Sequence, residues 1–263
     1  MSGICGFVGR GDPAVVRAML AAIDYRGDTS HVAEGAGCTL GYRHWAGRPG
    51  KSPGIHRDDA DMVACAGGFA PACESPAAAL RDRLASGLDA LDGAFAAAWW
   101  DGARNRLTLV RDPFGNRSLY FCEHAGVFYF ASEVKQLLAI PGLPVELNHA
   151  AIHKYLTFSF IPGEETPIKG VRRLLPGRIA RWHEGRLESE PYFTLRERID
   201  PELADKRAAC TLIRRRCQEA VAARLNGERE VGVFLSGGLD SSGVAAWLQE
   251  SGVAGGARGR LQW

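Results

Sequence analysis

Hydrophobic and polar positions in the first part of the chain follow two different periods, which predict strands and helices in alternation. The apolar run at residues 3–8 ends at Gly9 and predicts a buried strand at the start of the chain. Asp12-Pro13 is a helix-capping pair, and the apolar positions after it recur at helical spacing as far as Arg26-Gly27. Such a strand would hold residue 2 at a fixed point.

Strand patterns dominate after a second helix, which Ser75-Pro76 begins and Gly87 ends. Short apolar or alternating runs cover residues 94–100, 107–110, 118–122 and 127–131, and glycine-containing turns separate them. Prolines punctuate residues 140–177, which predicts a connecting segment with at most a short helix over 150–158. A hairpin follows around Glu184-Gly185. The pattern predicts an α+β layered domain with antiparallel sheet.

The pattern changes near residue 200, where a new domain is expected to begin. A long helix is predicted over residues 203–225, followed by a short strand at 232–235, a glycine loop at 236–240 and a helix over 241–250. Residues 252–263 show no periodicity and are rich in Gly, Ala and Arg, which GC-rich codons yield in a wrong reading frame. We therefore expect two domains, at 1–195 and 200–263, with the second one cut short by a truncation or frameshift.

Charge and cysteine content narrow the classes of partner. Thirty-two basic residues stand against 30 acidic ones, a net charge of +2 that is too small for binding to nucleic acid or an anionic membrane. Seven scattered cysteines without a C-x-x-C pair predict neither a disulfide framework nor a zinc site. No signal peptide or membrane span is apparent. These features predict a cytoplasmic protein that acts on small molecules, with a homodimer left open.

The glycine loop S-G-G-L-D-S-S at residues 236–242 carries the clearest chemistry. A loop that joins a strand directly to a helix gathers backbone N–H groups and hydroxyls around one point, where an anion is stabilised. Glycines let the backbone approach a phosphate closely. The alternative reading is a simple strand-to-helix turn. The residues predicted to form this phosphate site are Phe234, Leu235, Ser236, Gly237, Gly238, Asp240, Ser241 and Ser242.

Together with this loop, four stretches resemble the glutamine-hydrolysing asparagine synthetase family. They are residues 3–7 (GICGF), 111–120 (RDPFGNRSLY), 130–137 (FASEVKQL) and 161–177 (IPGEETPIKGVRRLLPG). The resemblance implies an N-terminal-nucleophile glutaminase domain, an αββα sandwich, followed by the start of an α/β ATP-pyrophosphatase domain. It also implies ATP and Mg²⁺ as cofactors, with most Mg²⁺ ligands beyond residue 252. The implied substrates are aspartate or another carboxylate, and glutamine or ammonia.

Three positions depart from the family pattern. The family's N-terminal cysteine nucleophile, exposed by removal of Met1, corresponds to Ser2, and a glutamine-holding arginine corresponds to His44. The Asn-Gly-Glu-Ile motif of the family falls on residues 66–69, where Ala66 replaces the asparagine and only Gly67 remains as a backbone donor. A serine hydroxyl has a far higher pKa than a thiol. We therefore expect glutamine hydrolysis to be weak or absent.

Three functions remain open on the sequence alone. The first is a ligase that converts aspartate to asparagine. The second is a diverged amide synthetase without glutaminase activity, such as a relative of the β-lactam synthetases or lasso-peptide cyclases. The third is an inactive relic or a binding module. Cys5 is predicted to be a buried core residue rather than a substitute nucleophile. Core positions are also predicted for Trp99, Trp100, Phe114 and Phe130, and the Arg111-Asp112 pair is expected to brace the nucleophile loop or to form a structural ion pair.

Overall fold

The computed structural model describes residues 2–46, 54–69, 75–86, 92–197, 199, 201–225 and 231–250. The chain forms two compact units, with the change from the first to the second between Thr194 and Leu195. The predicted helix end at Gly87 and the predicted irregular segment at 252–263 lie outside the described residues.

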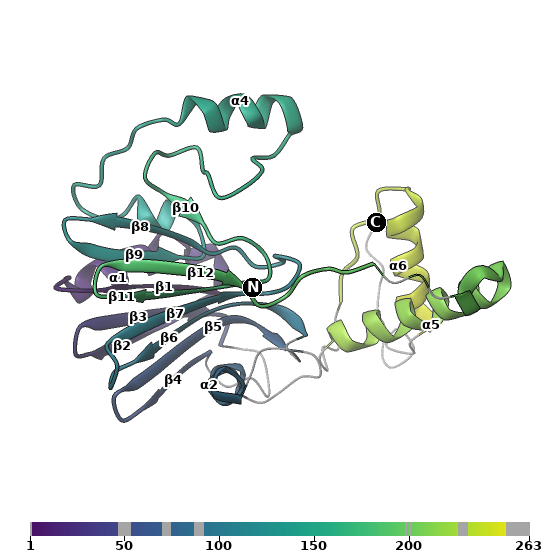
Figure 1. Ribbon diagram of the computed structural model, residues 1–263, viewed down its shortest axis with the longest axis horizontal. Helices are drawn as coiled ribbons and strands as arrows, with labels where there is room; N and C mark the ends of the chain where they lie inside the picture. The colour runs from purple at the N-terminus through teal and green to yellow at the C-terminus, as the bar shows by residue number, and fades with distance from the viewer. Residues whose placement is uncertain are drawn as a thin grey trace. The chain divides into compact units, whose positions relative to one another are not determined.

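The first unit is built on two stacked antiparallel sheets, each with six strands among the described residues (Figure 1). In spatial order the first sheet contains β10 (Arg172–Arg173), β8 (Tyr120–His124), β9 (Val127–Ala131), β1 (Gly3–Val8), β3 (Cys38–His44) and β2 (Thr29–Gly35). The second contains β12 (Arg186–Pro191), β11 (Arg178–His183), β7 (Arg106–Arg111), β6 (Gly93–Asp101), β5 (Asp61–Phe69) and β4 (Ile55–Asp58).

Strand β1 lies inside its sheet, between β9 and β3. Successive side chains of a strand point to opposite faces. Ile4 accordingly packs in the core between the two sheets, whereas Cys5 and Phe7 pack on the outer face. Burial on both faces explains why the sequence reads as a continuous apolar run, and it fixes the position of Ser2 just before the strand.

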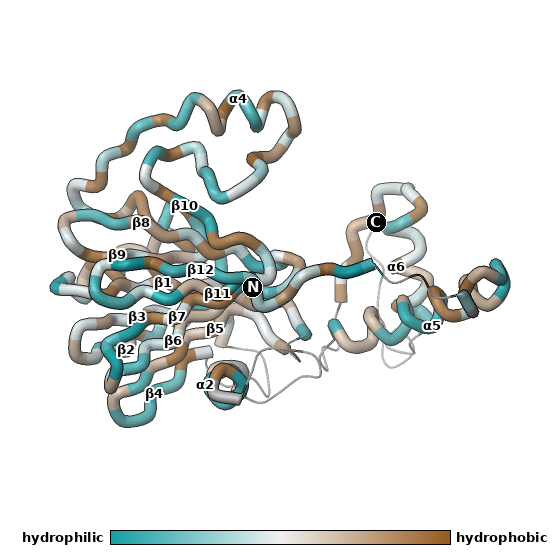
Figure 2. The backbone as a smooth tube through the Cα atoms, in the orientation of Figure 1, coloured by the Kyte–Doolittle hydropathy of each residue, from teal (hydrophilic) through white to brown (hydrophobic). Residues whose placement is uncertain are grey.

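Two helices cover the outer faces of the sandwich. Helix α1 (Pro13–Ala21) begins where the Asp12 side chain accepts a hydrogen bond from the Ala14 N–H, and its buried residues pack against the first sheet. Helix α2 (Pro76–Ser86) places Ala77 and Leu80 against the second sheet. The result is the αββα sandwich that the sequence predicts. Strand β12 closes one edge of the second sheet with a hydrophilic sequence (Figure 2), which disfavours further strand pairing.

A short helix and an exposed helical arm complete the first unit. Helix α3 (Val134–Leu137) follows β9. Helix α4 (His149–Phe158) is capped by Asn148, ends at Ser159 in the left-handed region and confirms the helix predicted over residues 150–158. Figure 1 shows α4 and its flanking segments rising beyond the first sheet.

The second unit contains the short helix η2 (Pro201–Ala204) and the helices α5 (Lys206–Leu225) and α6 (Leu239–Glu250). Both α5 and α6 confirm predicted helices. The strand predicted at residues 232–235 is wrong, because residues 231–236 are irregular and the Phe234 side chain is fully exposed. A strand needs a hydrogen-bonding neighbour, and the described part of this unit offers none.

Candidate active site

Ser2 and Gly67 meet where the two sheets of the first unit come together. Ser2 directly precedes β1 of the first sheet, and Gly67 belongs to β5 of the second. The Gly67 N–H donates a hydrogen bond of 3.1 Å to Ser2 Oγ. A hydroxyl and a backbone donor that are brought together in this way are the minimum elements of a nucleophile and its oxyanion stabiliser.

The backbone at Gly67 has a conformation that only glycine adopts readily. Its φ is +101°, and a Cβ atom there would lie 2.0 Å from the carbonyl oxygen of Ala94 on the neighbouring strand β6. Ala66 is buried in the core between the sheets and has no polar side chain to offer. The donor at this position is therefore the Gly67 N–H.

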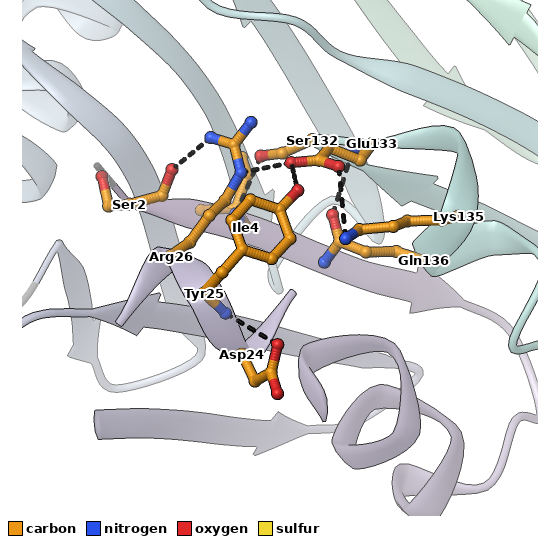
Figure 3. Close-up of polar contacts among 9 residues, drawn as sticks. All are labelled: Ser2, Ile4, Asp24, Tyr25, Arg26, Ser132, Glu133, Lys135 and Gln136. Atoms are coloured by element: carbon orange, nitrogen blue, oxygen red, sulfur yellow. Dashed lines mark hydrogen bonds and ion pairs between the residues drawn. The ribbon is translucent and has the colours of Figure 1, made fainter. Parts of the chain in front are cut away.

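A charged network fixes the peptide of residue 2 (Figure 3). Arg26 Nη1 donates a 3.0 Å hydrogen bond to the Ser2 carbonyl oxygen, and Arg26 Nε forms an ion pair with Glu133. The Tyr25 hydroxyl donates to the same Glu133 oxygen, and Lys135 Nζ lies 3.8 Å from the centre of the Tyr25 ring. Burial disfavours the charge on Arg26, but the bonds to Tyr25 and Glu133 outweigh it and raise its pKa.

Sequence reasoning missed Arg26 and Glu133 as members of this site. In the sequence, Arg26 lies at the end of a helical pattern, and Glu133 is one residue of the stretch at 130–137 that resembles the family. The pairing joins residues 107 positions apart, which periodicity within one element cannot reveal. Two features of the sequence could have indicated them together: an arginine just after the first predicted helix, and a Ser-Glu pair directly after a buried strand.

Two further side chains face the same region. Burial raises the pKa of the Tyr42 phenol, although hydrogen bonds to Ser2 and Gly54 act in the opposite direction. Burial and the nearby positive charge of Arg26 lower the pKa of Arg117, and Arg117 Nε is buried without a hydrogen-bond partner. Ser2 thus has a phenol and guanidinium groups in its surroundings.

His44 forms part of a stack of three rings. The His31 and His44 ring centres are 5.3 Å apart, their Nε2 atoms are 3.2 Å apart, and the Tyr42 ring stacks on His44 at 5.0 Å. Burial and the neighbouring His31 lower the pKa of His44. Neutral His44 therefore does not supply the positive charge of an arginine at pH 7.

This stack predicts a loss of stability in mild acid. Because the folded state lowers the pKa of His44, its stabilising contribution is full above the unfolded pKa of about 6.5 and falls as the pH drops below that value. The loss should stay below about 1 kcal/mol, since the ring is partly exposed to solvent. Urea unfolding at pH 7.5 and pH 5 measures it. His44→Gln should reduce this pH dependence, whereas His124→Gln on β8 should leave it unchanged.

Arg111 and Asp112 brace the turn that follows β7, and they do so separately. Arg111 donates to the carbonyl oxygens of Gly115, Arg117 and Leu174 at 2.6–2.8 Å. The Asp112 carboxylate accepts from the backbone N–H groups of Phe114, Asn116 and Arg117. The expected ion pair between them is therefore wrong, because carbonyl and amide groups of the turn satisfy both side chains.

The remaining predictions about the core have different outcomes. Cys5 is fully buried, its Sγ lies 3.8 Å from the Val16 carbonyl oxygen, and burial raises its thiol pKa, which confirms a core cysteine. Trp100 and Phe130 are also core residues, and Trp99 is partly buried against the core of the second sheet. The prediction for Phe114 is wrong: 66% of it is exposed, because it lies on the turn that Asp112 shapes.

The glycine loop of the second unit is exposed and rich in hydroxyl groups. Ser236 Oγ and Ser241 Oγ lie 3.0 Å apart, Ser236 N donates to Ser241 Oγ, and Gly237 has a φ of +77°. Helix α6 begins at Leu239, so residues 239–242 of the predicted loop form the first turn of the helix. Hydroxyls and a helix N-terminus can together hold a phosphate group.

The described residues contain neither a cluster of metal ligands nor a membrane-spanning helix. No group of three or more His, Cys, Asp or Glu side chains is placed to hold a metal ion there. Within the same described ranges, no helix combines the length and hydrophobicity that crossing a lipid bilayer demands.

The fold and two segments of the chain are similar to known proteins. A solved structure entitled as the allosteric regulatory enzyme of purine biosynthesis has the same fold, with a TM-score of 0.50 and 15% sequence identity over 95% of this chain and 63% of that one. Residues 74–193 match the family model described as a glutamine amidotransferase domain. The first unit therefore has the N-terminal-nucleophile glutamine amidotransferase fold. Residues 212–254 match the model described as asparagine synthase.

Two curated relatives agree with this assignment. A Mycobacterium bovis protein, provisionally named asparagine synthetase [glutamine-hydrolyzing], is 36% identical over 60% of this chain and 25% of its own length. Asparagine synthetase [glutamine-hydrolyzing] 3 of Bacillus subtilis is 30% identical over 60% of this chain and 26% of its own. The match spans about a quarter of each relative. The predicted resemblance to the glutamine-hydrolysing asparagine synthetase family is thereby confirmed.

Proposed function

We propose that this chain is part of an ATP-dependent, AMP-forming amide ligase of the asparagine synthetase type, which converts aspartate to asparagine. The observation that carries the proposal is the order of the two family matches, at residues 74–193 in the first unit and 212–254 in the second. The proposed domains are accordingly 1–195 and 200–263. Glutamine or free ammonia would supply the nitrogen.

The first unit would release ammonia from glutamine at Ser2. After removal of Met1, the Ser2 hydroxyl would attack the side-chain amide carbon while the α-amine of Ser2 takes up the hydroxyl proton. The Gly67 N–H, which faces Ser2 Oγ at 3.1 Å, would turn to the developing oxyanion. The C–N bond would then break, ammonia would leave with the proton, and water would release glutamate. Neutral His44 contributes no positive charge, and Ala66 contributes no polar side chain. This hydrolysis activity should therefore be weak.

The second unit would bind ATP through its glycine loop. The hydroxyls of Ser236, Ser241 and Ser242 and the backbone around Gly237 and Gly238 fit the pyrophosphate portion of ATP, because they are exposed or partly exposed and adjoin the start of α6. Phe234, Leu235 and Asp240 complete the proposed set. Mg²⁺ bound with ATP would supply positive charge at the phosphate oxygens. The aspartate carboxylate would attack the α-phosphate, and pyrophosphate would leave. Ammonia would then displace AMP from the acyl-adenylate.

A second candidate is a diverged amide synthetase that uses an amine other than ammonia. Ser2, His44 and Ala66 favour it, because all three replace groups that glutamine hydrolysis needs. In that case the carboxylate substrate would differ from aspartate while the ATP chemistry would remain the same.

Exchange of labelled pyrophosphate into ATP tests both candidates. Exchange that depends on aspartate supports the asparagine synthetase function, and exchange with another acid only supports the second candidate. A Ser241→Ala variant, which removes a hydroxyl of the loop, should reduce exchange strongly, whereas Thr211→Ala at an exposed position of α5 should not. If the chain neither exchanges pyrophosphate with any acid nor binds ATP, the proposed ligase role is wrong for this chain.

A further inference from the structure

The Glu133 carboxylate is placed to act on residue 2 without touching it. It forms an ion pair with Arg26 Nε, and Arg26 Nη1 donates to the Ser2 carbonyl oxygen at 3.0 Å (Figure 3). One guanidinium group therefore links the carboxylate to the backbone of the proposed nucleophile. Because the guanidinium is planar and rigid, fixing one edge of it also fixes the direction of the other.

The link is shielded from water far more than an ordinary surface ion pair. The side chains of Arg26 and Glu133 are 17% and 21% exposed, whereas those of the Arg17–Glu34 pair on the same unit are 60% and 51% exposed. Exposed pairs contribute little, and partly buried charges interact more strongly. The Arg17–Glu34 pair is thus a matched comparison within the same protein.

Glu133 is itself held from several sides, through both its carboxylate and its backbone. The Tyr25 hydroxyl donates to it, Lys135 Nζ lies 3.9 Å from its second oxygen, and the Gln136 side chain accepts a 3.0 Å bond from the Glu133 N–H. Ser132 meanwhile ties the same segment to β1, since its Oγ accepts from the Ile4 N–H at 2.9 Å. The segment after β9 therefore contacts both β1, which directly follows Ser2, and Arg26, which is hydrogen-bonded to the Ser2 carbonyl oxygen.

We infer that Glu133 is a positioning residue for the nucleophile, acting through Arg26 to fix the peptide of Ser2 and to balance the positive charge beside it. The inference rests on the proposed glutaminase role of residue 2. Without the carboxylate, Arg26 would lose its orientation and the positive potential at residue 2 would rise. The lost orientation should lower kcat for glutamine, and the higher positive potential should lower the pKa of a thiol placed at residue 2.

The test uses the Ser2→Cys protein, in which Cys73, Cys210 and Cys217 are replaced by serine so that only the thiol at position 2 reacts readily. Buried thiols such as that of Cys5 should not compete. Alkylation by iodoacetamide across pH gives the pKa of that thiol, and glutamine hydrolysis gives kcat and KM. Mass spectrometry verifies that Met1 has been removed.

Glu133→Ala should lower kcat for glutamine by about tenfold or more, because misplacing a reacting group is costly. It should also lower the thiol pKa by on the order of half a unit, since the nearby positive charge is no longer balanced. Glu133→Gln keeps an oxygen acceptor for Arg26 and Tyr25, so it should retain more of kcat while showing the same direction of pKa shift. Glu34→Gln, in the exposed pair, should change neither quantity.

A role in folding alone would lower the melting temperature of Glu133→Ala and leave the thiol pKa unchanged, and that result would overturn the inference. Equal kcat in Glu133→Ala and the parent protein would overturn it as well. If the parent protein hydrolyses no glutamine at all, the proposed glutaminase fails. The alkylation pKa still reports whether Glu133 acts on residue 2, so the two failures are distinguishable.

Discussion

Replacing Gly67 with alanine is expected to destabilise the first unit by about 3 kcal/mol or more. The new Cβ would lie 2.0 Å from the Ala94 carbonyl oxygen, and the backbone at this position has a φ of +101°, which alanine adopts only under strain. Relief of the contact requires β5 and β6 to separate where they pair at Gly67 and Phe95. The loss should be measured as the free energy of unfolding in urea.

The neighbouring glycine provides the control. A Cβ at Gly68 would meet no atom within 4 Å, so Gly68→Ala should change the free energy of unfolding by less than about 1 kcal/mol. If Gly67→Ala is as stable as the wild type, the close approach of β5 to β6 described above is wrong. The Gly67 N–H would then also lose its assigned position beside Ser2 Oγ.

Much of the first unit could be predicted because its elements are marked locally. The run at 3–8 is apolar on both faces and Val127–Ala131 is bounded by turns, so β1 and β9 are where the pattern predicts them. Helix α1 also starts where Asp12-Pro13 predicts, but it ends at Ala21, before the predicted end at Arg26-Gly27. In contrast, β2 and β3 were not predicted. The residues of β2 are only partly buried and include polar side chains, so neither a continuous apolar run nor a strict alternation marks it.

Only part of the candidate site could be predicted from the sequence. Ser2, His44, Ala66 and Gly67 came from alignment with family motifs, which works one segment at a time. Arg26 and Glu133 act on Ser2 through contacts between distant segments, which become visible only when β1, η1 (Asp24–Arg26) and the segment after β9 lie side by side. The strand predicted at residues 232–235 is wrong for a related reason. An apolar run forms a strand only where a second strand lies beside it, and the sequence of the run does not reveal whether such a neighbour is present.

Ser2→Cys is expected to raise the rate of glutamine hydrolysis by at least about tenfold. A free cysteine has a pKa of about 8.5, so a few per cent is thiolate at pH 7, whereas a serine hydroxyl is almost entirely protonated. The surroundings at position 2 favour the anion further: the Gly67 N–H faces the side chain, and Arg26 contacts the backbone of the same residue. Ammonia release from glutamine, followed over time with purified protein, measures the gain.

Ser2→Ala provides the baseline, because it removes the nucleophile and keeps the Gly67 donor. Activity of Ser2→Cys above this baseline would show that the site around residue 2 still binds glutamine, and that the serine limits the rate. Equal activity in Ser2→Cys and Ser2→Ala would contradict the prediction, since a reactive thiol would then have no substrate held near it. The neutral His44, in place of an arginine, would in that case be the cause, and a Ser2→Cys, His44→Arg double variant should restore hydrolysis where the single variants do not.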